Sequence, residues 1–117
     1  QGPLAYVVHD GDDAGPLARK IAEQARDAGL AIVVNAGGGS MKSQMKRADA
    51  SGADYAVIVG EAEAAEGKAM VKALRAADVT APFAQQRPLA LAELGETLAA
   101  ALAAATEFDD QPISGKN

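Results

Sequence analysis

The chain has 117 residues, a formal charge of −5 and a hydrophobic share of 49%. This length fits one domain that can bury its core without disulfides or structural metal ions. The sequence has no cysteine, which excludes disulfides, thiolate zinc sites and a cysteine nucleophile. The negative charge argues against a non-specific nucleic-acid binder, because attraction to phosphates usually shows as clustered Lys and Arg.

The absence of cysteine also favours a reducing compartment, so we expect a cytoplasmic protein. No apolar run approaches the roughly 18 to 20 residues needed to span a bilayer, and the first residues lack a signal-peptide pattern. We therefore expect no membrane partner. The sequence starts at Gln1 without an initiating Met, so we expect it to be a fragment of a longer chain.

The first third of the chain predicts a strand, a helix and a second strand. Residues 4–9 (LAYVVH) and 30–34 (LAIVV) are short, apolar and rich in β-branched side chains, as buried strands are. Between them, residues 14–28 carry apolar side chains at spacings of three and four and end at Gly29, which predicts an amphipathic helix. Two strands and a helix in this order imply a right-handed parallel crossover.

A glycine turn at residues 37–39 leads into a second predicted helix, for which Ser40 is a suitable N-cap. This helix is expected to end near Gly52. Its inner face is marked by Met41, Met45 and Ala48, and its outer face by Lys42, Lys46 and Arg47. The run YAVIV at residues 55–59 then predicts a third, buried parallel strand ended by Gly60.

The pattern after Gly60 is less regular. Residues 61–67 are expected to form an acidic turn, residues 68–74 an antiparallel edge strand, and residues 83–86 a short strand. Residues 89–105 predict an Ala- and Leu-rich helix interrupted by Gly95. The whole is an α/β fold, an open sheet of four or five strands, parallel in its first three, with helices on both faces.

We expect one domain over residues 4–106. Residues 107–117 are polar and contain Pro112 and Gly115, so they are expected to form a disordered C-terminal tail.

Three motifs each have a functional and a structural interpretation. The glycine turn before a helix can offer backbone N–H groups to a phosphate, but it lacks the spacing of a dinucleotide or P-loop motif, which favours a tight turn by about three to one. His9 is the only histidine and is expected to be solvated at a strand end, with no metal site. The acidic residues Glu61, Glu63 and Glu66 are expected to form a solvated turn rather than a catalytic pair, although Glu61 follows directly on the third strand.

Basic residues gather in two clusters: Lys42, Lys46 and Arg47, and Lys68, Lys72 and Arg75. A solvated helix face and an RNA-binding surface explain the first cluster about equally well. RNA-binding modules read exposed single strands and need only modest positive charge, and the second cluster favours this interpretation slightly. With two Tyr, two Phe and no Trp, stacking on aromatic side chains cannot be extensive.

Residues 37–75 closely resemble the anticodon-binding domain of bacterial histidine tRNA ligases, and looser similarity extends over about residues 4–104. The matching features are the glycine turn, Lys42, Gln44, the Lys46-Arg47-Ala48-Asp49 step, Gly52, the strand running into Gly60-Glu61, Glu63, Gly67, Val71-Lys72 and Leu74-Arg75. The resemblance implies the class IIa anticodon-binding fold, a three-layer open mixed sheet of about five strands with helices on both faces.

The resemblance also implies a function. The chain is expected to bind the anticodon loop of histidine tRNA, while a catalytic domain of the same chain attaches histidine with ATP and Mg in a homodimer. None of the class II catalytic motifs is present, so this fragment is expected to have no catalytic residue and no cofactor of its own. The expected tRNA contacts are Lys42, Lys46 and Arg47 with phosphates, and Glu61, Glu63, Lys72 and Arg75 near bases.

Two other functions remain open on the sequence alone. One is a free-standing regulatory or binding module derived from such a ligase. The other is a flavodoxin-like binder of a small ligand or phosphate that uses the glycine turn.

Overall fold

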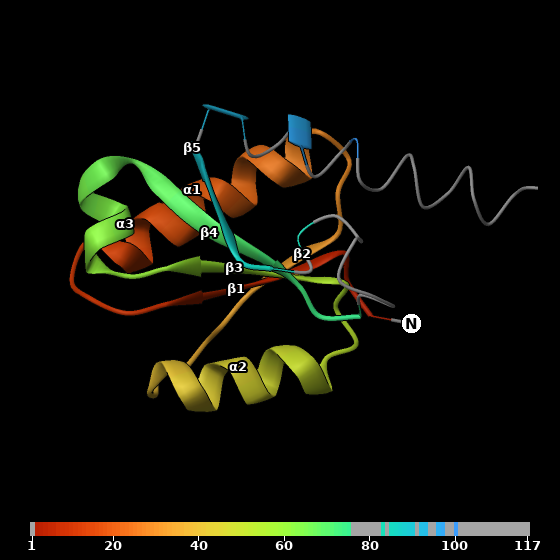
Figure 1. The fold of residues 1–117 in the computed structure, drawn as a ribbon, viewed down its shortest axis with the longest axis horizontal. Helices are drawn as coiled ribbons and strands as arrows, with labels where there is room; N and C mark the ends of the chain where they lie inside the picture. The colour runs from red at the N-terminus through yellow and green to blue at the C-terminus, as the bar shows by residue number, and fades with distance from the viewer. Residues whose placement is uncertain are drawn as a thin grey trace, which may run out of the picture.

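A computed structural model describes residues 2–75, 83, 85–90, 92, 93, 96, 97 and 100. They form a mixed five-stranded sheet in the order β2-β1-β3-β4-β5, covered on one face by α1 and α3 and on the other by α2 (Figure 1). The elements are β1 (Ala5–His9), α1 (Ala14–Asp27), β2 (Ile32–Val34), α2 (Met41–Ala50), β3 (Tyr55–Val59), α3 (Glu61–Glu66), β4 (Lys68–Ala73) and β5 (Arg87–Ala90).

The parallel half of the sheet confirms the predicted strand and helix order. β1 lies in the middle, with Ala5 aligned to Ile32 of β2 on one side and to Tyr55 of β3 on the other, both in parallel. β1 is buried from Ala5 to Val8 because helices cover both faces of the sheet. The predicted α/β fold class is confirmed.

Alternate side chains of β1 enter two separate cores. Val7 packs under α1, whose inner surface consists of alanines and Ile21, so the helix can lie close to the sheet. Tyr6 and Val8 face α2 and form a smaller core with Ala48 and Ala53.

The acidic segment after β3 is a short helix, α3, and not the expected turn. Glu63 Oε1 accepts a hydrogen bond from the Gly60 N–H at 2.9 Å, which satisfies one of the free donors at the start of the helix. Gly67 ends the helix with φ +68°, a left-handed conformation that glycine adopts without steric cost.

The prediction that residues 68–74 form an edge strand was right about the antiparallel strand and wrong about the edge. β4 pairs antiparallel with β3 and also with β5, in which Pro88 lies opposite Met70. The edge strand beside β4 is β5, where Pro88 is tolerated because an edge strand has one unpaired side. The short strand expected at 83–86 therefore lies at Arg87–Ala90, and Leu89 belongs to it rather than to a helix.

An aromatic pair, half-buried Tyr55 and buried Phe83, lies at the N-terminal end of β3. The rings of Tyr55 and Phe83 meet edge to face with centroids 6.0 Å apart, and the Arg87 guanidinium lies 5.3 Å from the Phe83 ring centre. Burial, aided by the charge of Asp54, raises the pKa of the Tyr55 hydroxyl above its usual range. The Tyr55 hydroxyl therefore stays protonated to a higher pH than the hydroxyl of a free tyrosine.

Residues 92, 93, 96, 97 and 100 are helical, within the helix predicted for 89–105. The expected tail, 107–117, lies outside the described residues, so the division into a domain at 4–106 and a tail stays a prediction. Within the described part of the chain, no helix is long and apolar enough to cross a membrane.

Gln44 of α2 completes the hydrogen bonding of β1 where β2 ends. The Val7 carbonyl accepts from the Asn35 N–H at 2.8 Å, and β2 stops there, so on that side no strand residue remains opposite His9. Gln44 takes that place: its Oε1 accepts from the His9 N–H, and its Nε2 donates to the His9 carbonyl, each at 2.8 Å. A side-chain amide has the donor and acceptor of a peptide group, so it satisfies both backbone groups.

Asn35 joins the glycine turn to the sheet in a similar way. Its Oδ1 accepts from the Tyr6 hydroxyl at 2.7 Å, and its Nδ2 donates to the Gly38 carbonyl at 3.1 Å. Gln44 Nε2 also donates to the Gly39 carbonyl at 2.9 Å. Asn35 and Gln44 are only 3% and 1% exposed, so these amides form a buried polar network that fixes the turn.

Replacing Gln44 should destabilise the fold more than any change on the outer face of the same helix. In Gln44→Ala the His9 N–H, the His9 carbonyl and the Gly39 carbonyl lose their partner, and the free energy of unfolding should fall by about 2 kcal/mol. Lys42→Ala, at an exposed position of α2, should change it by less than about 0.5 kcal/mol. Urea denaturation measures both, and equal midpoints for the two variants would contradict the role given to the amide.

Candidate nucleic-acid interface

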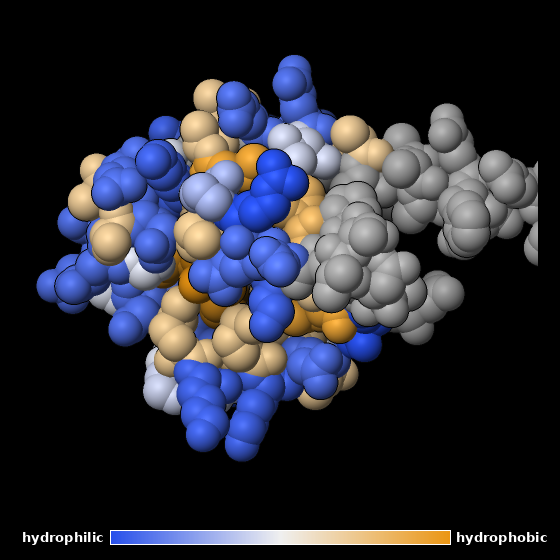
Figure 2. Space-filling model, in the orientation of Figure 1, coloured by the Kyte–Doolittle hydropathy of each residue, from blue (hydrophilic) through white to orange (hydrophobic). Residues whose placement is uncertain are grey.

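The outer face of α2, the helix that follows the glycine turn, carries exposed lysines. Ser40 caps the helix by accepting a hydrogen bond from the Ser43 N–H at 3.1 Å. Lys42 and Lys46 lie one helical turn apart and are exposed, and neither has a hydrogen-bond or ion-pair partner among the residues that the structure describes. Hydrophilic side chains project from α2 away from the sheet (Figure 2), where a phosphate backbone can reach them.

Arg47 lies on the same helix but holds the glycine turn. Its Nη1 donates to the Gly38 carbonyl at 2.8 Å and to Asn35 Oδ1 at 3.1 Å. A guanidinium has five N–H donors, so these two bonds leave others for a ligand. Arg47 thus connects the predicted basic face to the buried network.

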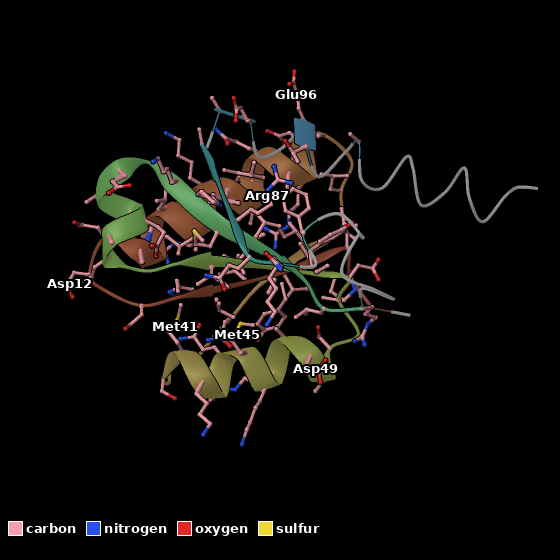
Figure 3. All side chains as sticks on the ribbon, viewed as in Figure 1. Asp12, Met41, Met45, Asp49, Arg87 and Glu96 are labelled. Atoms are coloured by element: carbon pink, nitrogen blue, oxygen red, sulfur yellow. The ribbon has the colours of Figure 1, made fainter. Side chains whose placement is uncertain are left out.

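The sheet face beside α2 is half open. α2 packs mainly against β1, and its Met41 and Met45 point toward the sheet (Figure 3). Because side chains alternate along a strand, Met70 and Lys72 of β4 share this face with Ile58 of β3. Ile58 and Met70 are half-buried and Lys72 is exposed. Apolar surface with a cation beside it is therefore accessible on the side of the sheet where α2 lies.

Glu61 and Glu63 lie at another place, the carboxyl edge of the parallel strands. α3 starts with them directly after β3 and packs on the same face as α1, opposite α2. Glu63 is held by its bond to Gly60, whereas Glu61 is exposed. Glu61 is thus the more accessible of the two carboxylates.

Arg75 closes the end of α2. Its Nη2 donates to the Asp49 carbonyl at 2.9 Å and its Nε to the Gly52 carbonyl at 3.2 Å. A cation at a helix C-terminus satisfies free carbonyls and interacts favourably with the helix dipole. Because β4 runs antiparallel to β3, Arg75 lies at the opposite end of the sheet from Glu61.

The seven predicted contact residues therefore do not form one cluster. Lys42, Lys46 and Lys72 lie on the side of the sheet that α2 covers, and Arg47 and Arg75 make structural bonds at the two ends of α2. The glutamates lie at the carboxyl edge.

Sequence reasoning gave no role to Asn35 and Gln44, which position α2 and the turn. The sequence did offer a signal for Asn35, because a polar residue between a buried strand and three glycines is placed to bind the turn. For Gln44 there was only its place in the resemblance, because a single polar residue on a helix carries no sign of burial.

His9 is half-buried rather than solvated. Its Nε2 lies 3.1 Å from the Asn35 carbonyl, and since a carbonyl only accepts, this nitrogen is the donor. In the described portion of the chain no group of three or more His, Asp or Glu side chains could hold a metal ion.

The chain matches known proteins in both sequence and structure. A family model described as an anticodon binding domain matches residues 5–101. The chain is 53% identical over 93 residues to a histidine–tRNA ligase of Bordetella avium, which covers 80% of this chain and 21% of that protein. It is 46% identical over 108 residues to the ligase of Aromatoleum aromaticum, covering 92% and 23%.

Among solved structures, the histidyl-tRNA synthetase of Nostoc sp. PCC 7120 superposes with a TM-score of 0.73 at 30% identity, over 87% of this chain and 23% of that one. The RNA-binding domain of a threonyl-tRNA synthetase from Cryptosporidium parvum shares the fold, with a TM-score of 0.61 at 17% identity. The chain spans only about a fifth to a quarter of the length of the ligases it matches. The family model, which extends from β1 to beyond β5, shows that the chain belongs to the anticodon-binding domain family.

Proposed function

We propose that this chain binds the anticodon arm of histidine tRNA as the anticodon-binding part of a histidine tRNA ligase. The observation that carries the proposal is the match of the anticodon-binding family over residues 5–101. The exposed lysines of α2 and the half-open sheet face beside them supply the chemistry that such a ligand needs.

The contacts divide into phosphate and base contacts. Lys42 and Lys46 bind backbone phosphates, and Arg47 adds the donors that the glycine turn does not use. Bases splayed out of the loop lie against the half-exposed apolar face, where Lys72 reaches their edges.

Three further residues complete the site. Glu61 and Glu63 accept from base N–H groups at the carboxyl edge of the sheet. Arg75 acts mainly by fixing the end of α2.

In the parent ligase, the chemistry takes place in a catalytic domain of the same chain, which uses ATP and Mg to attach histidine to the tRNA. This chain contributes binding and register, so that the acceptor end of the tRNA reaches that domain. The parent enzyme works in the cytoplasm as a homodimer.

A free-standing module of the same fold is the alternative. The full gene separates the two, since the ligase requires a catalytic domain upstream.

The direct test is a binding assay of the 117-residue chain against histidine tRNA and an unrelated tRNA. Tighter binding of histidine tRNA supports the proposal. Equal or absent binding of both would count against it.

Charge reversal on α2 should weaken tRNA binding and reduce its salt dependence. Lys42→Glu and Lys46→Glu each remove one lysine–phosphate interaction, and each should lower the slope of log K against log salt by about 0.7 to 0.9. Lys20→Glu is the matched control, because Lys20 is an exposed lysine on α1, on the other face of the sheet. The same slope for Lys46→Glu and Lys20→Glu would show that RNA does not bind at α2.

Glu61→Gln should change the preference among anticodon variants with little change in the salt slope, because base contacts specify and phosphate contacts position. Glu66→Gln is its control on α3, where Glu66 is exposed and pairs with Lys68 at 3.4 Å. Binding of a set of anticodon-substituted tRNAs measures the effect. If both variants kept the wild-type ranking, Glu61 would have no part in base recognition.

A further inference from the structure

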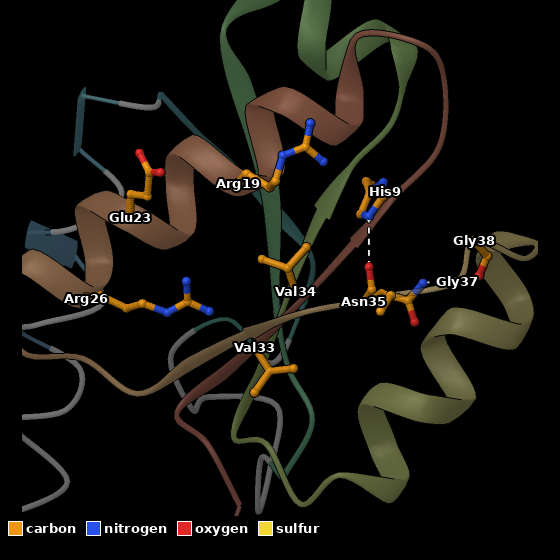
Figure 4. A pocket seen from close by; sticks show the side chains of 10 residues that line it. His9, Arg19, Glu23, Arg26, Val33, Val34, Asn35, Gly37 and Gly38 are labelled. Atoms are coloured by element: carbon orange, nitrogen blue, oxygen red, sulfur yellow. Dashed lines mark hydrogen bonds between the residues drawn. The ribbon is translucent and has the colours of Figure 1, made fainter.

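An open pocket of about 560 Å³ lies between α1, the end of β2 and the glycine turn (Figure 4). The pocket lies on the far side of the glycine turn from α2. Its walls are formed by Arg19, Glu23 and Arg26 of α1, by His9, and by residues 33–38. The volume is in the range of small-molecule sites.

The pocket is lined by more positive than negative charge, although the chain as a whole is acidic. Arg19 and Arg26 are seven residues apart, so they lie on the same side of α1, and Figure 4 shows Arg26 reaching over β2 and Arg19 extending toward His9. Arg26 Nη2 donates to the Ile32 carbonyl at 3.1 Å, which leaves its other N–H groups available. Within the described residues, Glu23 forms no ion pair with either arginine.

The glycine turn forms a wall that a ligand can approach closely. A Cβ placed on Gly37 or Gly38 would have no atom within 4 Å, so the space in front of their backbone is open. The turn is held in place by hydrogen bonds, because Asn35 and Arg47 both donate to the Gly38 carbonyl. The pocket thus combines a fixed backbone wall with two guanidinium groups.

We propose that this pocket binds a phosphate group, with Arg19 as its charged contact. A planar guanidinium matches the oxygens of a phosphate with two parallel hydrogen bonds, which a lysine cannot do. The phosphate belongs either to the RNA backbone or to a free phosphorylated small molecule. The site is separate from the lysines of α2. It also gives the glycine turn a binding role, which the proposed anticodon contacts do not.

The first experiment titrates the 117-residue chain with inorganic phosphate and follows the amide signals of Gly37 and Gly38 by NMR. Saturable shifts are expected in the wild type, and Arg19→Gln should weaken binding about tenfold, the effect of removing one charge-assisted hydrogen bond. Lys20→Gln removes the same charge from the adjacent exposed position and should leave the affinity unchanged. Arg19 has no partner among the described residues, so Arg19→Gln should keep the wild-type melting temperature.

The second experiment identifies the source of the phosphate by measuring the salt dependence of histidine tRNA binding for the same two variants. A slope about 0.7 to 0.9 lower in Arg19→Gln alone assigns the pocket to the RNA backbone. An unchanged slope, together with weakened binding of inorganic phosphate, assigns it to a free phosphorylated molecule.

No saturable shift in the wild type, or the same response from Arg19→Gln and Lys20→Gln in both experiments, would overturn the proposal. The proposed tRNA function is tested separately by Lys46→Glu. If the chain bound no tRNA, the phosphate titration would still decide whether the pocket is a site.

Discussion

The arrangement of both proposed sites depends on the side-chain amide of Gln44, which acts as a peptide group beside β1. β2 is only three residues long and ends opposite Val7, two residues before β1 ends, so the backbone of His9 would be left without a partner on the side of β2. An unpaired buried peptide group costs about as much as a lost hydrogen bond. Because Gln44 of α2 satisfies the His9 peptide groups, it fixes the position of the helix on the sheet. The exposed residues of the helix are thereby fixed in position too.

The glycine turn connects the two proposed sites physically. On one side Arg47 and Asn35 hold the Gly38 carbonyl, and on the other Gly37 and Gly38 form the wall of the pocket. Gly37, Gly38 and Gly39 all have positive φ, which side chains with a Cβ adopt only with strain. The turn is therefore specified twice, by glycines that permit its conformation and by buried amides that select it.

The elements that follow from local patterns were predictable, and those that depend on distant pairing were not. β1, α1, α2 and β3 each carry a complete periodic signal, and Ser40 is the N-cap that its position indicated. β5 could not be placed, because a short stretch containing Pro88 has no strand signal until β4 offers it a partner. The lysines of α2 could be recognised in the sequence as a charged helix face. The side of the sheet on which Lys72 lies could not, because it depends on how β4 pairs with β3. The burial of Asn35 and Gln44 follows from where β2 stops, which no local pattern encodes.

A chain with a charge of −5 can bind RNA if its cations are not neutralised where the RNA lies. The one ion pair among the described residues, Lys68 with Glu66, lies at the start of β4, away from the outer face of α2. Lys42 and Lys46 therefore keep their charge for phosphates in direct contact. Charges more distant than the Debye length, about 8 Å at physiological salt, are largely screened. Asp49 of α2 lies three residues from Lys46, within this range, whereas acidic residues beyond it weaken binding at the proposed site little. The distant acidic residues disfavour close approach of RNA elsewhere, and this difference favours a single docking orientation over non-specific adhesion.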